Sequence, residues 1–200
     1  PPVISQGVGP LSKSLNEDTT ASWTASEVNA SDGDTNASSL AWSLVTAPSH
    51  GTAIVDGNGS YPTTLSYQPN ANFNGSDSFS VQVSDGENND SITINLTINS
   101  VNDNPIVHSI NGQSLSNSLT AEIQVTENSS ISLDINASDS IEGDTITFEK
   151  TGGTDRSMFD LNSSTGILSL SSAPDFENPT DADANNTYEI WFRANDGNGG

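Results

Sequence analysis

Apolar and polar residues alternate along several stretches of this chain, and this period of two constrains the fold more than any other feature. Between residues 78 and 83, Phe79, Val81 and Val83 alternate with Ser and Gln, and between 91 and 99 four branched apolar residues alternate with Thr and Asn. Such alternation places the apolar side chains on one face of a half-buried β-strand. No helical stripe of useful length is present. The sequence therefore predicts an all-β fold.

Turn-forming pairs separate the expected strands at short intervals. Asn74-Gly75, Asp85-Gly86 and Asn111-Gly112 are examples, and strand-like segments recur roughly every 8 to 15 residues. Several short strands with such turns over about 100 residues are typical of a β-sandwich. The chain of 200 residues holds two such sets.

The two halves of the chain share motifs at an offset of about 107 to 111 residues. A polar segment, 102–105, lies between them and ends in a proline, which cannot donate to a central ladder. We therefore expect module 1 at residues 1–104 and module 2 at residues 105–200. Module 1 has a strand-like stretch at 91–99 after Asp85-Gly86, whereas the chain stops soon after the matching Asp196-Gly197, so the closing strand of module 2 is expected to be absent. The matched motifs are Asn16-Glu17 with Thr126-Glu127, Asn29-Ala30-Ser31-Asp32 with Asn136-Ala137-Ser138-Asp139, and Ser84-Asp85-Gly86 with Asn195-Asp196-Gly197.

The charge balance narrows the choice of partner. The formal net charge is −22, with only 4 Lys and Arg residues, so the chain lacks the cations that nucleic acids and anionic membrane surfaces require. No apolar run approaches the roughly 18 residues that insertion into a membrane needs. Because cysteine is absent, zinc-thiolate sites and thiol catalysis are excluded. Divalent cations bound through oxygen are the expected partners.

Several motifs resemble those of the cadherin superfamily. In module 2 they follow the order of the second half of a cadherin repeat, and in module 1 they are similar to bacterial cadherin-like repeats of large surface adhesins. The resemblance implies an all-β chain of two tandem Ig-like or cadherin-like Greek-key β-sandwiches, joined by a calcium-binding linker. It also implies a location outside the cell or on a bacterial cell surface. The motifs are Phe159-Asp160-Leu161-Asn162, Thr165-Gly166-Ile167-Leu168, Asp175-Phe176-Glu177 and Ala194-Asn195-Asp196-Gly197 in module 2, and Asn16-Glu17-Asp18, Trp42-Ser43-Leu44, Ser49-His50-Gly51-Thr52 and residues 72–79 in module 1.

The resemblance also implies which residues bind calcium. In cadherins the linker binds calcium together with residues of the modules before and after it. Ser100 and Ile141 stand where that pattern has aspartates, so we expect fewer ions than a complete cadherin linker holds. Carried over residue by residue, the linker site comprises Glu17, Asn102, Asp103, Asn104, Asp139 and Asp196; a preceding linker would use Asp32, Asp34 and Asp85, and a following one Glu127, Asp175 and Glu177.

A further calcium loop is predicted at Asp181, Asp183 and Asn185, which have the one, three, five spacing of such loops. Asn186 replaces the usual glycine there, and Phe192 stands where a closing glutamate would be. Calcium takes six to eight oxygens from carboxylates, amide side chains and backbone carbonyls, and clusters of Asp, Asn and Gly supply them. The alternative for every one of these clusters is that Asp, Asn and Gly are simply good turn formers.

Enzymatic motifs are missing from the sequence. The two histidines, His50 and His108, fall in different modules without partners at metal or triad spacing, and no G-x-S-x-G motif occurs. The carboxylates are interleaved with Asn and Gly in turns, which suits metal binding better than acid catalysis. We therefore predict a non-enzymatic, calcium-dependent cell adhesion module that acts as a calcium-rigidified extender of a secreted or surface-anchored bacterial adhesin.

The alternative function is recognition of cell-surface polysaccharide or of like modules in a homophilic contact. Trp191 lies out of phase with Tyr188, Ile190 and Phe192, so it is expected on the outer face of its strand. An exposed aromatic ring there could stack on a glycan. Cover by a neighbouring loop or strand is the other explanation.

Overall fold

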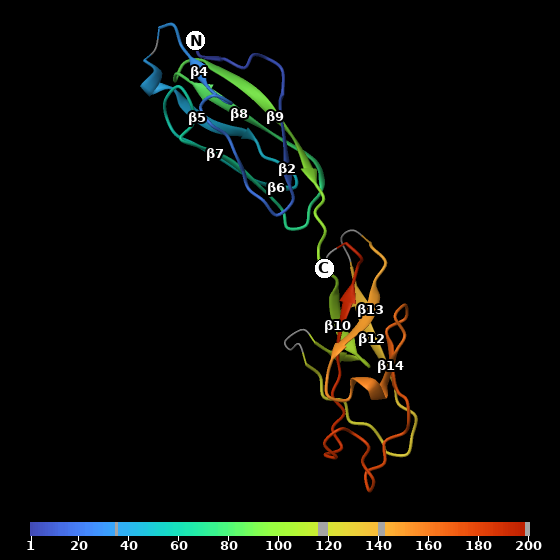
Figure 1. Cartoon of the computed structure of the whole chain (residues 1–200). Helices are drawn as coiled ribbons and strands as arrows, with labels where there is room; N and C mark the ends of the chain where they lie inside the picture. The colour runs from blue at the N-terminus through green and yellow to red at the C-terminus, as the bar shows by residue number, and fades with distance from the viewer. Residues whose placement is uncertain (35, 116–119, 140–142, 199–200) are drawn as a thin grey trace. The chain divides into compact units, whose positions relative to one another are not determined.

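The computed structural model describes residues 1–34, 36–115, 120–139 and 143–198 (Figure 1). The chain divides into two compact units, Pro1–Val101 and Asn102–Gly200, so their boundary falls slightly before the one predicted from the sequence. The all-β fold is confirmed, and within the described ranges no helix is long and apolar enough to cross a membrane. The strands are β1 (Val3–Ile4), β2 (Leu11–Asn16), β3 (Ala21–Ser22), β4 (Ala30–Ser31), β5 (Ala41–Thr46), β6 (Gly51–Asp56), β7 (Thr64–Pro69), β8 (Gly75–Ser84), β9 (Asn89–Asn99), β10 (Ile106–Ile110), β11 (Gln113–Ser114), β12 (Ser132–Ser138), β13 (Thr147–Gly152), β14 (Phe159–Leu161), β15 (Ile167–Leu170) and β16 (Trp191–Asn195), and the 3₁₀ turns are η1 (Ala37–Ser39) and η2 (Arg156–Met158).

Unit 1 is a sandwich of two sheets with the strand orders β2-β9-β8-β5 and β3-β7-β6, and β1 pairs separately with β4. Strand β9 lies between β8, to which it runs antiparallel, and β2, to which it runs parallel. The alternation seen in the sequence explains this central position. The apolar residues of β8 and β9 face inward with exposed fractions of 0 to 3%, namely Phe79, Val81, Val83, Ile92, Ile94, Leu96 and Ile98.

Aromatic residues complete the core of unit 1. Trp42 is buried and its indole N–H donates to the carbonyl of Gly59 at 2.9 Å, so the polar end of the ring is satisfied. Trp23 packs edge-on against Phe79 with ring centroids 5.7 Å apart. This core contains fourteen buried apolar residues.

Unit 2 repeats part of this arrangement. Its larger sheet has the order β11-β10-β12-β15-β14, and β13 pairs with β16 in a separate two-stranded sheet. The antiparallel β13–β16 ladder matches the β5–β8 ladder of unit 1, and both ladders change register near their ends. The core of unit 2 is much smaller, with four buried apolar residues in its main cluster: Ile135, Phe148, Phe159 and Leu168. Among the described residues, unit 2 therefore buries fewer apolar side chains in its main cluster than unit 1 does.

Candidate metal centres

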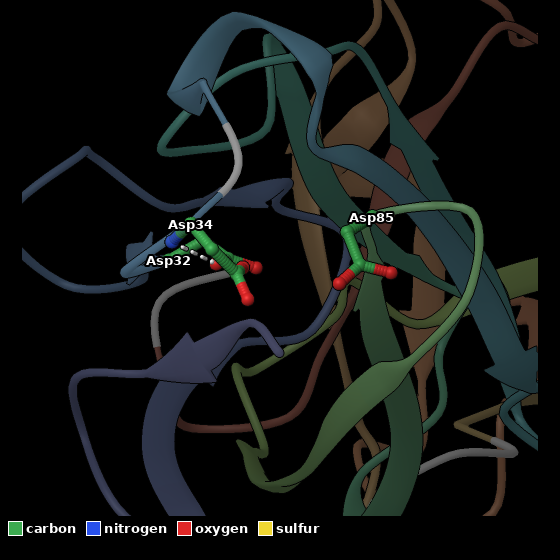
Figure 2. A group of neighbouring side chains, drawn as sticks. All are labelled: Asp32, Asp34 and Asp85. Carbon is green, nitrogen blue, oxygen red and sulfur yellow. Dashed lines mark hydrogen bonds between the residues drawn. The ribbon is translucent and has the colours of Figure 1, made fainter.

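Three aspartates of unit 1 come together at one end of its sheets. Asp32 follows β4, Asp34 lies two residues further along, and Asp85 begins the turn between β8 and β9 (Figure 2). One carboxylate oxygen of each lies within 4.8 Å of the others. The backbone N–H of Asp34 donates to Oδ1 of Asp32 at 3.0 Å, so the loop itself holds these two residues near each other.

The spacing of these oxygens suits a calcium ion. Calcium binds oxygens at about 2.3 to 2.6 Å, so two ligands on opposite sides of one ion lie about 4.6 to 5.2 Å apart. Three oxygens within 4.8 Å of one another can therefore share an ion.

Asp85 is held in place by its own turn. Its Oδ1 accepts hydrogen bonds from the backbone N–H groups of Asn88 at 2.6 Å and Glu87 at 2.8 Å. These hydrogen bonds, that from Asn88 first, hold the pKa of Asp85 below its usual value, although the nearby charge of Asp32 opposes them. Asp85 is therefore ionised at neutral pH and ready to bind a cation.

Unit 2 contains a second triplet, Glu127, Asp175 and Glu177, whose carboxylate oxygens also lie within 4.8 Å of one another. Glu127 Oε2 accepts from the backbone N–H of Phe176 at 2.9 Å, which ties it to the segment that carries the other two residues. Asp175 Oδ1 accepts from the N–H groups of Glu177 and Asn178, each at 3.1 Å. The backbone of one loop thus brings together the residues that the sequence assigned to a following linker.

Glu17 and Glu127 occupy equivalent positions in the two units. The residue after each has a φ of 57°, Asp18 in one case and Asn128 in the other, a conformation that Asn and Asp tolerate better than most residues. Glu17 is 2% exposed, and its Oε1 accepts from the backbone N–H of Val101 at 2.7 Å. Its Oε2 is buried and has no hydrogen-bond partner. A buried oxygen of this kind has lost its water and fits a cation ligand.

The other predicted linker residues lie in unit 2. Asn102 Nδ2 donates to Asp196 Oδ2 at 2.7 Å, so the start of the unit contacts the end of β16. Asn102 Oδ1 and Asp139 Oδ2 are buried without a hydrogen-bond partner. Asp103 is half-buried and Asn104 is exposed. Whether all six residues bind one set of ions stays a prediction, and Ile141 lies outside the described residues.

The predicted calcium loop at Asp181 and Asp183 has a different arrangement. Asp181 is 5% exposed, and its two oxygens accept from the backbone N–H groups of Asn185 at 2.7 Å and Asn186 at 3.2 Å. Asp183 Oδ2 accepts from Asn185 Nδ2 at 2.7 Å. Through these contacts the carboxylates of Asp181 and Asp183 hold the loop together themselves. Calcium binding at Asp181 and Asp183 therefore stays a prediction, and a purely structural role in the turn is the alternative explanation.

Two buried aspartates outside the predicted sites have structural roles. Asp77 is 9% exposed and accepts from the backbone N–H groups of Ser49, His50 and Ser78 and from the hydroxyl of Tyr67. The burial of Asp77 could have been inferred from the sequence, because Asp77 lies in phase with the inward-facing Phe79 of the same strand.

Asp155 is 2% exposed and accepts from the N–H groups of Ala182 and Glu189. No periodicity marks it in the sequence.

Residues 1–99 match the family model of the bacterial Ig domain. A search of curated protein sequences finds no match. Among solved structures, Drosophila N-cadherin EC1-4 is similar with a TM-score of 0.58 and 14% identity, over 96% of this chain and 45% of that one.

Other cadherins are similar at comparable levels. The human desmocollin-1 ectodomain has a TM-score of 0.51 and 17% identity, over 100% of this chain and 38% of that one. Mouse cadherin-23 EC22-24 has a TM-score of 0.50 and 19% identity, over 96% of this chain and 64% of that one. This chain thus spans less than two thirds of each of these structures. At such identities the likeness shows the fold alone, which is a cadherin-like, Ig-like β-sandwich. Residues 1–99 thus match a bacterial Ig domain, and the chain as a whole has a cadherin-like, Ig-like fold.

Proposed function

We propose that this chain is a calcium-binding extender segment of a secreted or surface-anchored bacterial adhesin. The cadherin-like, Ig-like fold is that of an adhesion or extender module. The observation that carries calcium binding is the pair of carboxylate triplets, one in each unit, at positions equivalent to parts of a repeated linker site. Since each repeat would contribute ligands to the linkers before and after it, bound calcium would convert its binding energy into stiffness along a tandem array.

The excess of acidic residues supports a role for cations. The chain carries 26 Asp and Glu residues against 4 Lys and Arg residues, so its carboxylates repel one another. In each triplet three carboxylates lie within 4.8 Å of one another, which concentrates this repulsion at two points. A divalent cation bound there would remove it locally, and a chelator would restore it.

Calcium at 1 mM is expected to raise the melting temperature of both units relative to chelator. A site with a dissociation constant of about 10 µM would stabilise the folded state by about 2.7 kcal/mol at this concentration. Scanning calorimetry in calcium, in magnesium and in chelator at matched ionic strength measures the shift and separates it from screening. Equal melting temperatures and scattering profiles in calcium and chelator would remove calcium from the proposal.

Variants assign the shift to the two triplets. Asp32→Asn with Asp34→Asn is expected to remove the calcium response of unit 1 only, and Glu127→Gln with Glu177→Gln that of unit 2 only. Asp85 is left intact because it holds its own turn. Asp56→Asn, an exposed change in β6, is the matched control and is expected to keep the full response.

Recognition of polysaccharide is the second candidate, and the exposure of Trp191 favours it. Its side chain is 67% exposed, whereas the neighbouring Phe192 is half-buried, as the phase of the strand predicts. An amphipathic ring in this position suits stacking on a sugar face.

Trp191→Ala is then expected to abolish retention of the chain on insoluble polysaccharides while circular dichroism shows an unchanged fold. Co-sedimentation with a panel of polysaccharides, in calcium and in chelator, measures the retention. Tyr61→Ala removes another exposed aromatic ring, in unit 1, and serves as the control. Unchanged retention of the Trp191→Ala variant would exclude this residue from recognition.

A further inference from the structure

The outer face of the larger sheet of unit 1 carries no charged side chain on three neighbouring strands. Strands β2, β9 and β8 lie side by side in this sheet (Figure 1). Every outward residue of β8 from Ser76 to Ser84 and of β9 from Asn89 to Asn99 is Ser, Thr, Asn or Gln. Strand β2 continues the pattern, from Ser12 opposite Asn95 to Asn16 opposite Asn99. These outward residues together form what we call the hydroxyl-amide face.

The fold itself does not require this absence of charge. Protein surfaces commonly carry about 25 to 35% charged residues, and this chain has a net charge of −22. In unit 2 the ladder of β13 and β16 presents the ion pair of Glu149 and Arg193 at outward positions. In the other sheet of unit 1, β6 presents the exposed Asp56. The hydroxyl-amide face is therefore a neutral surface on an otherwise acidic chain.

A shallow depression of about 440 Å³ lies at one end of this face, a volume within the usual range of about 300 to 1,000 Å³ for ligand sites. The turn before β6 borders it with the exposed His50, whose ring stacks on Phe73 with centroids 4.2 Å and planes 16° apart. An aromatic ring with one side supported thus lies beside a row of hydroxyl and amide groups. The face contributes Ser76, Ser78, Asn95 and Thr97 to the lining.

Hydrogen bonds hold the borders of the depression in place. Asp77 accepts from the backbone N–H groups of Ser49 and His50 on one side and of Ser78 on the other, so it ties the turn to β8. The carbonyl of His50 accepts from the N–H of Asn70 at 2.8 Å, which ties the turn to the segment that carries Phe73. The lining groups are therefore positioned before a ligand arrives, and this lowers the ordering cost of binding.

We infer that the depression and the hydroxyl-amide face bind a neutral, extended polysaccharide. Hydroxyl and amide side chains both donate and accept hydrogen bonds, as sugar hydroxyls do, and the ring of His50 offers a stacking surface for a sugar. Adjacent strands lie about 4.8 Å apart, which is close to the length of one sugar unit, so successive units can meet successive strands. An anionic polysaccharide would be repelled by the net charge of −22.

This site shares its ligand class with the second candidate function but rests neither on Trp191 nor on the carboxylate triplets. A second copy of the chain fits the face less well. The centres of protein interfaces are rich in aromatic residues, Met and Arg, whereas the outward positions here are small and polar. Two strongly acidic copies would also repel each other.

Nuclear magnetic resonance of the isotope-labelled whole chain tests the inference. Cellohexaose, mannohexaose and xylohexaose are the neutral probes, and a hexamer of galacturonate is the anionic one, each added up to about 10 mM. At least one neutral probe is expected to cause saturable shifts of the amides of residues 49–50, 76–78 and 95–97, and the anionic probe none. The shifts are expected to be the same in calcium and in chelator, so the result is independent of the calcium proposal.

Asn95→Asp places a charge in the depression without changing the size of the side chain, and it is expected to weaken binding by about tenfold. His50→Ala removes the ring but keeps the backbone N–H that donates to Asp77, and it is expected to weaken binding as well. Asn136→Asp, the same exchange at an exposed position of β12 in unit 2, is the matched control and is expected to have no effect.

Three results would overturn the inference. The first is that no neutral probe shifts the amides around the depression, even if amides near Trp191 respond and the second candidate function survives. The second is equal binding by the Asn95→Asp variant and the native chain. The third is a dimer in sedimentation whose contact covers the hydroxyl-amide face, which would assign the face to a second copy.

Discussion

Replacement of Asp77 by alanine is expected to lower the free energy of unfolding of unit 1 by about 3 to 5 kcal/mol. The carboxylate is 9% exposed and accepts from the N–H groups of Ser49 at 3.0 Å, His50 at 2.9 Å and Ser78 at 2.8 Å, and from the hydroxyl of Tyr67 at 2.8 Å. Alanine would leave these donors without their acceptor and would open a cavity beside them. Urea unfolding, followed by the fluorescence of Trp42 and Trp23, measures the change.

The pH dependence of the same contact gives an independent check. Burial raises the pKa of Asp77, but the hydrogen bonds from Ser49, His50, Tyr67 and Ser78 outweigh it, and the pKa is lower than the usual 3.8. A carboxyl whose pKa is lower in the folded state stabilises the fold above its unfolded pKa and loses this effect as the pH falls through the folded pKa. Unit 1 should therefore lose stability below about pH 4.

Asp77→Asn keeps the shape of the side chain and removes its charge. It is expected to lower the free energy of unfolding of unit 1 by less than Asp77→Ala does. It should also abolish the loss of stability at low pH that arises from protonation of Asp77. Burial, followed by the hydrogen bond to Asp77, also raises the pKa of Tyr67, so either variant should lower that pKa in a spectrophotometric titration. An alanine variant within about 1 kcal/mol of the native chain would contradict the structural role of Asp77.

The carboxylates of this chain fall into two groups that differ in what their oxygens contact. Asp77, Asp155 and Asp181 accept backbone N–H groups on both oxygens, so these carboxylates hold loops together. The two triplets instead bring several carboxylates within 4.8 Å of one another, and Glu17 has a buried oxygen without a partner. Hydrogen-bond saturation therefore separates the structural carboxylates from the candidate metal ligands, although the residue types are the same.

Local patterns predicted the parts of the structure that depend on neighbouring residues. Strict alternation predicted β8 and β9, because their inward side chains meet one continuous core. The resemblance to cadherin repeats assigned Asp32, Asp34 and Asp85 to one linker site, and their carboxylate oxygens lie within 4.8 Å of one another.

Contacts between distant segments could not be predicted in the same way. Apart from the adjacent Ser78, the donors to Asp77 come from the turn before β6 and from β7, which lie 10 to 28 residues away in the sequence. By contrast, the phase of the strand alone predicted the difference in exposure between Trp191, which is 67% exposed, and the half-buried Phe192.

Asp155→Ala is expected to destabilise unit 2 by about 2 to 4 kcal/mol. Asp155 Oδ1 accepts from the N–H of Ala182 at 2.7 Å and Oδ2 from the N–H of Glu189 at 2.9 Å, so one side chain holds both ends of the intervening loop. Its loss would leave two N–H groups without their acceptor in a unit with four buried apolar residues in its main cluster. Since a domain of about 100 residues is stabilised by roughly 5 to 15 kcal/mol in total, the loss is a large fraction.

Hydrogen exchange of the β13 and β16 amides measures this loss separately from unit 1. Thr154→Ala is the control: the hydroxyl of the adjacent Thr154 donates to Glu189 Oε2 at 2.8 Å in an exposed position, so its removal should cost less than about 1 kcal/mol. If both variants change exchange equally, Asp155 has no special role in the loop. If only Asp155→Ala accelerates exchange in both strands, the loop and the two-stranded sheet unfold as one cooperative element, because Glu189 directly precedes the segment that leads into β16.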